Sequence, residues 1–74
     1  MIRYSNHSGN SGVTGYASSA DSITVRFSNG ETYLYTYNST GRHDVEQMKR
    51  LAKEGRGLST YISTKVKSRF ARKL

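Results

Sequence analysis

The chain contains no cysteine. Its absence excludes a disulfide framework and a thiolate metal site, and it fits a reducing compartment. No apolar run approaches the ~20 residues that a membrane-spanning helix needs. The first residues also lack the basic-then-apolar pattern of a signal peptide. These absences together predict a cytoplasmic protein without a membrane span.

The length of 74 residues allows one domain with a thin core. Residues 5–12 read "SNHSGNSG", a polar segment rich in serine, asparagine and glycine, and this composition is typical of poorly ordered chain. We therefore expect a flexible N-terminal lead-in over residues 1–11 and a single α+β domain over residues 12–74.

Positive charge is concentrated in the second half of the sequence. The net charge is +7, and residues 1–41 carry two basic and two acidic side chains that cancel. Residues 42–74 carry ten Lys or Arg against three acids, so they hold the entire excess. A one-sided positive field attracts polyanions such as RNA, DNA, an anionic membrane or an acidic protein surface.

Alternating apolar residues predict a β-hairpin after a first strand in "VTGYASSA". Ile23, Val25 and Phe27 fall on one side of the stretch "SITVRFS", which is the period of a half-buried strand. The Asn-Gly pair that follows is a strong hairpin signal. The stretch "ETYLYTYN" then forms the third strand, with tyrosines at alternate positions: Tyr33, Tyr35 and Tyr37.

The length of the hairpin loop decides which way these tyrosines face. A two-residue turn would pair Val25 with Leu34 and place the tyrosines beside Arg26 as an exposed surface for base stacking. A three-residue loop, with Gly30 in the left-handed conformation, would pair Val25 with Tyr33 and bury them. One-sided burial suits a small sheet packed against helices, so we favour the bulged hairpin while the tyrosine motif stays either core or stacking platform.

Two helices are expected to follow the strands. Asp44 would cap the first, with Gln47 completing a capping box, and Gly55 would end it. Ser59 would cap the last helix, whose apolar stripe recurs every four residues through the end of the chain. The predicted fold is a three-stranded antiparallel sheet followed by two C-terminal helices packed on one face.

The last helix carries the strongest indication of function. Its basic residues have no acid among them from Arg56 onward, whereas a structural helix face usually alternates acids with bases. Lysine and arginine there would neutralise phosphates, and a tyrosine would stack on an unpaired base. The predicted nucleic-acid-binding residues are Arg56, Tyr61, Lys65, Arg69, Arg72 and Lys73.

No catalytic set, metal site or cofactor site is predicted. His43 lies next to Asp44, but catalysis needs a nucleophile and a base at hydrogen-bond distance with a third group orienting the base. Nothing in the sequence fixes such a geometry. We therefore expect a protein that is not an enzyme.

The motif formed by Phe27, Gly30, Tyr33 and Tyr35 resembles the KTSC domain family, which occurs at the C-terminus of some lysyl-tRNA synthetases and also alone. The resemblance runs from about residue 11 to residue 70 and rests on "GY", "ITVRFSNGETYLY", "LAKEG" and "LSTYI". This chain departs from the family in lacking a proline after the Tyr-x-Tyr strand, and Glu54 stands where the family often has serine. The resemblance implies an RNA-binding role.

The prediction is therefore a small nucleic-acid-binding module, with RNA or another polyanion as the partner. The alternative is a protein-interaction module, of the kind that a phage uses to modulate a host protein, which docks the same basic patch on an acidic partner. The sequence leaves the oligomeric state open.

Overall fold

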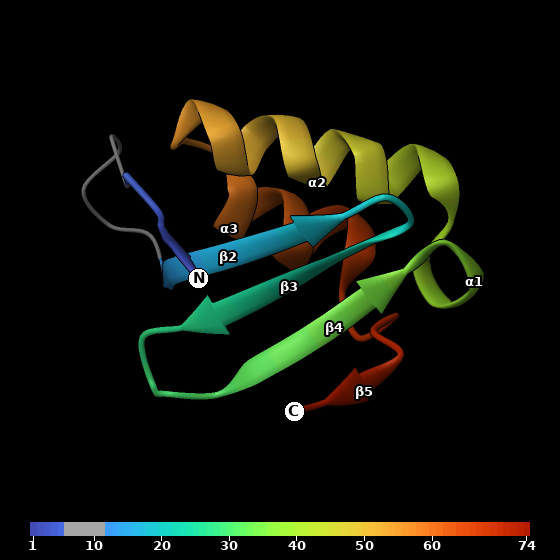
Figure 1. Cartoon of the computed structure of the whole chain (residues 1–74), viewed down its shortest axis with the longest axis horizontal. Coiled ribbons are helices and arrows are strands. Elements are labelled where there is room, and N and C mark those ends of the chain that lie inside the picture. Colours follow the sequence, from blue (N-terminus) through green and yellow to red (C-terminus); the bar gives the residue numbers. More distant parts are fainter. Residues whose placement is uncertain (6–11) are drawn as a thin grey trace.

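Five strands form one antiparallel sheet in which each strand pairs with the next along the chain (Figure 1). In this computed structural model, residues 1–5 and 12–74 are described. The strands are β1 (Ile2–Arg3), β2 (Val13–Ser19), β3 (Ser22–Phe27), β4 (Thr32–Thr36) and β5 (Arg72–Lys73). The α+β class is as expected, but the prediction of three strands is wrong.

The two strands that the sequence did not predict lie at the edges of the sheet. Each has only two residues, which is too short for an alternating pattern to be recognised. Backbone hydrogen bonds extend the β5 pairing on both sides, from Ala71 N to Leu34 O at 2.7 Å and from Leu74 N to Thr32 O at 2.7 Å. Backbone pairing with the neighbouring strand therefore determines where β1 and β5 form, and their own side-chain pattern does not.

The bulged hairpin is confirmed. Val25 lies opposite Tyr33, and Ile23 lies opposite Tyr35. The loop residue Gly30 has φ 88°, a conformation that costs glycine little. Ile23 and Val25 consequently share the face that the helices cover with Tyr33 and Tyr35, whereas Leu34 lies on the other face.

The helices lie together on one side of the sheet (Figure 1). They are α1 (Tyr37–Thr40), α2 (Arg42–Glu54), α3 (Leu58–Tyr61) and the π-helical turn η1 (Ile62–Val66) that continues α3. Tyr37 begins α1 instead of ending the third strand, because Thr36 and Ser39 form a capping box there. The helix α2 begins at Arg42 with Gly41 as its N-cap, so the prediction that Asp44 caps it is wrong, whereas Gly55 is its C-cap as expected.

The predicted last helix is much shorter than its apolar stripe indicated. It begins at Leu58 with Gly57 as its N-cap, so Ser59 is not the cap, and it ends at Val66. Lys67 follows with φ 53° and ψ −124°, which turns the backbone out of the helix. Residues beyond this turn come back to the sheet and form β5, so one continuous basic helix to residue 74 does not exist.

The N-terminal residues that the structure describes belong to the folded unit. The strand β1 pairs with β2, and Tyr4 is only 2% exposed, within the core. The other part of the expected lead-in, residues 6–11, lies outside the described residues.

The core fills the space between the sheet and the helices. Its fully buried members are Val13, Ile23, Val25, Tyr35, Val45, Met48, Leu58 and Val66. Within residues 1–5 and 12–74, no helix is long and apolar enough to cross a bilayer.

Candidate nucleic-acid interface

The six residues predicted to bind nucleic acid do not form one surface. Tyr61 and Arg69 are bonded to Asp44, and Lys73 forms an ion pair with Glu31. The remaining three residues, Arg56, Lys65 and Arg72, lie on three separate elements: the turn between α2 and α3, the turn η1, and the edge strand β5. Half of the predicted site is thus used for structure.

Asp44 joins the first turn of α2 to the end of the helical layer. Its carboxylate accepts a hydrogen bond from the Tyr61 hydroxyl at 2.6 Å and an ion pair from Arg69. The Tyr61 hydrogen bond, with Arg69, lowers the pKa of Asp44. Burial and the bond to Asp44 raise the pKa of Tyr61 to about 12. Tyr61 is thus half-buried, and its hydroxyl is engaged in joining α3 to α2.

Arg69 is held by backbone carbonyls as well as by Asp44. Its guanidinium donates to Thr40 O at 3.1 Å and to Lys65 O at 2.9 Å. A planar fork that is saturated in this way fixes the chain after η1 against α1 and α2. This arrangement gives Arg69 a structural role, although its side chain is still 48% exposed.

The edge strand β5 sends its two basic residues to opposite faces of the sheet. Lys73 lies opposite Tyr33, on the helix side, and pairs with Glu31, whereas Arg72 lies opposite Leu34 on the other side. The hydrogen bond between the Glu31 and Lys73 side chains lowers the pKa of Glu31 and raises the pKa of Lys73. Successive side chains of a strand point to opposite faces of the sheet. Because these two residues lie on a strand and not on a helix, they do not share one basic patch.

The tyrosine motif is not a stacking platform. Tyr35 is 2% exposed in the core, and burial raises its pKa to about 12. Tyr33 is half-buried and packs on Phe70 with ring centroids 4.6 Å apart. Tyr37 lies on α1, where its hydroxyl bonds to Glu46, so each ring serves packing or helix attachment.

The sheet face turned away from the helices gathers arginines from three strands. Strand register assigns this open sheet face the following described residues: Arg3, Gly15, Ala17, Ser19, Ser22, Thr24, Arg26, Thr32, Leu34, Thr36 and Arg72. None of them is acidic, and none is aromatic. Arg3, Arg26 and Arg72 are exposed, and within the described part of the chain no ion pair engages their guanidinium groups.

The arginines are spread across the open sheet face at regular intervals. Arg3 and Arg26 lie opposite Gly15 from its two sides, which puts their Cα atoms about 10 Å apart at the usual strand spacing. Arg72 lies beyond β4, beside Leu34. Threonine, small side chains and Leu34 occupy the positions between them, so the arginines are surrounded by shorter side chains of mixed polarity.

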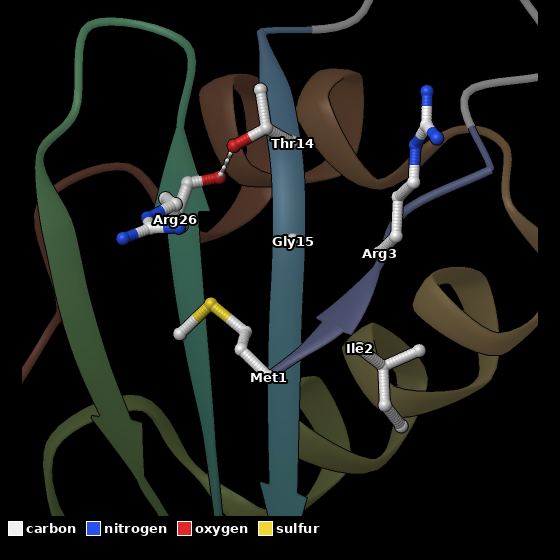
Figure 2. Close-up of a pocket in the computed structure, with 6 residues that line it drawn as sticks. All are labelled: Met1, Ile2, Arg3, Thr14, Gly15 and Arg26. Carbon is white, nitrogen blue, oxygen red and sulfur yellow. Dashed lines mark hydrogen bonds between the residues drawn. The ribbon is translucent and has the colours of Figure 1, made fainter.

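A shallow cavity of about 220 Å³ lies on this face above β1, β2 and β3. Figure 2 shows Arg3 and Arg26 on opposite sides of Gly15, with the Met1 side chain lying over β2 between them. Ile2 and Thr14 complete the lining. The Thr14 hydroxyl donates to Arg26 O at 3.3 Å and ties β2 to β3 at this point.

Only part of this surface was visible in the sequence. The alternation of "SITVRFS" places Arg26 opposite the apolar side of its strand, so its exposure follows from the pattern. Arg3 and Arg72 carry no such signal, because each belongs to a two-residue strand whose face is set by its partner. The charge excess of residues 42–74 instead indicated the helical half.

Comparisons with models of protein families, with curated proteins and with solved structures find no match to this chain. The resemblance to the KTSC domain therefore stays a prediction that rests on its motif residues.

Proposed function

We propose that this chain is a nucleic-acid-binding module without enzymatic activity, and that it contacts backbone phosphates of RNA through the open sheet face. One observation carries the proposal: exposed arginines from β1, β3 and β5 share a face on which no described residue is acidic. The absence of cysteine, which fits a reducing compartment, supports a cytoplasmic location.

The chemistry of the face favours phosphate over other anionic groups. Guanidinium forks match phosphate oxygens with two parallel hydrogen bonds, and threonine hydroxyls between them, such as those of Thr24 and Thr32, are further donors to phosphate. Three of the five acids are in ion pairs elsewhere, so they do not neutralise this surface.

Recognition through this face would depend little on base sequence. Stacking readers use aromatic side chains, and the described residues of the open sheet face include none. Contacts to phosphates fix position but carry no sequence information. The KTSC resemblance favours RNA over DNA, and a direct comparison of the two polymers tests that preference.

The test is the salt dependence of RNA binding in two double variants of equal charge. Three phosphate contacts to single-stranded RNA give a slope of log affinity against log salt of about −2, and Arg26→Gln with Arg72→Gln leaves one contact and about −0.7. Between about 50 and 200 mM salt, affinity should fall about 20-fold for the natural chain and about 3-fold for that variant.

The matched control is Arg50→Gln with Lys53→Gln. Both side chains are exposed on α2, so this variant loses the same two charges from the helix layer. We expect its salt slope to equal that of the natural chain. If the control loses the slope and the sheet variant keeps it, the helix layer is the binding surface and the proposal is wrong.

Replacing Lys65, Arg69 and Arg72 together by Glu would be a poor test of this proposal. Arg69→Glu would place two carboxylates together at Asp44 and would perturb folding as well as binding. An acidic protein partner remains the competing outcome: a stoichiometric protein recovered after nuclease treatment, with no measurable RNA affinity, would replace the nucleic-acid proposal.

A further inference from the structure

We infer that the cavity above Gly15 is a seat for one phosphate ester group, held between Arg3 and Arg26. This inference rests on the proposed function for the identity of the polymer. It adds that one nucleotide unit binds at a particular position on the open sheet face. The remaining arginine of the face, Arg72, would then contact a phosphate farther along the strand.

Charge is the first argument for an anion at this position. The lining residues include two arginines and no carboxylate. Neither guanidinium has an ion pair within the described residues. An anion seated between two arginines is attracted by both positive charges.

Geometry favours phosphate over carboxylate. Arg3 and Arg26 rise from opposite sides of Gly15 (Figure 2), so an anion between them is approached from two directions. A carboxylate offers two oxygens on one edge, whereas a phosphate offers oxygens to both forks. The guanidinium groups point outward in Figure 2, and because both side chains are exposed they change rotamer rapidly.

The floor of the cavity depends on the absence of a side chain at Gly15. A Cβ atom there would lie 3.2 Å from Ile2 O and 3.3 Å from Met1 Sδ, closer than such atoms normally pack. Glycine thus lets β1 approach β2 and keeps the hollow open. Its volume of about 220 Å³ exceeds the ~30 Å³ share of one water molecule several-fold.

The surroundings favour an ester in a chain over a free ion. The cavity opens onto the rest of the sheet face, where the surface continues past Thr24 and Leu34 to Arg72. Met1, 62% exposed, adds an apolar side chain beside the arginines. A sugar or base attached to the phosphate would find this apolar contact next to the charged one.

Amide-shift titration with inorganic phosphate, with chloride at equal ionic strength as reference, tests the seat directly. We expect saturable shifts at Thr14, Gly15 and Arg26. Arg3→Gln and Arg26→Gln should each weaken phosphate binding about tenfold, the usual effect of losing a hydrogen bond to a charged group. Arg50→Gln, on α2, should leave it unchanged. The spectra also show whether each variant keeps its fold.

Shifts that do not saturate, that centre on other residues, or that Arg50→Gln reduces as much as Arg3→Gln overturn the inference. A parallel titration with single-stranded RNA separates the two proposals. If phosphate occupies the cavity and RNA does not bind, the seat stands and the proposed function fails. If RNA binds through Arg72 and Arg3→Gln has no effect on either ligand, the function stands and the seat is wrong.

Discussion

Replacing Tyr4 by phenylalanine should destabilise the protein although it removes a single oxygen atom. The Tyr4 hydroxyl oxygen accepts a hydrogen bond from the backbone N–H of Leu58 at 3.2 Å. Leu58 is the first residue of α3, and no side chain caps this helix end at Gly57. Tyr4 therefore serves as a long-range cap for an N–H group that the helix itself cannot satisfy.

The expected magnitude follows from the burial of this bond. Tyr4 is 2% exposed and Leu58 is fully buried, so water cannot replace the lost oxygen without a rearrangement. A buried donor left without an acceptor costs about 1–3 kcal/mol. In a domain of this size, each 1 kcal/mol lowers the melting temperature by about 4–8 °C.

Tyr16→Phe is the matched control. Tyr16 is also in the core, 8% exposed, but its hydroxyl makes no hydrogen bond within the described residues. Urea unfolding of both variants, with equal m-values, should place Tyr4→Phe about 1 kcal/mol or more below Tyr16→Phe. Equal free energies of unfolding for the two variants would refute the capping role of Tyr4 and the anchoring of β1 through it.

Three further predictions concern the end of the helical layer. The pKa of Asp44 is lowered in the folded state. Its contribution to stability is therefore present above the ordinary value of 3.8 and is lost as the pH falls through the lower folded value. In urea unfolding at successive pH values, Asp44→Asn should reduce the fall in the free energy of unfolding at acid pH. Lys67→Gly should raise the free energy of unfolding by about 1 kcal/mol by relieving the positive φ, whereas Lys67→Ala, which keeps the strain, should not. Phe70→Ala should cost about 2 kcal/mol in thermal unfolding, because its ring packs on Tyr33 and Tyr35; an unchanged melting temperature would show that the segment after η1 is not anchored by this ring.

The candidate site was predictable only in its general chemistry. A net charge of +7 indicates a polyanion partner. The location of the binding surface depends on which basic side chains are not in ion pairs with acidic ones. Asp44 takes up Arg69, and Glu31 takes up Lys73. These pairs join residues 25 and 42 positions apart in the chain, and the helical periodicity of residues 58–74 gives no sign of them.

Local pattern determined the central part of the fold. Period-2 alternation and the Asn-Gly pair predict β3, β4 and the hairpin between them. The choice of the register that buries Tyr35 and half-buries Tyr33 also needed the expectation that helices cover one face of the sheet. The apolar stripe of α2 and its terminal Gly55 likewise act within a few residues. Such features depend on residues that are close in the sequence, so they can be predicted from it.

Tertiary structure alone decided the edges of the sheet and the arrangement of the free charges. The strands β1 and β5 exist because β2 and β4 offer unpaired backbone groups, and hydrogen bonding to a distant strand leaves no periodic trace in two residues. The same pairing turns Arg3 and Arg72 to the face that Arg26 already occupies. Composition thus sets how much positive charge this protein carries, and long-range strand pairing sets where that charge is available.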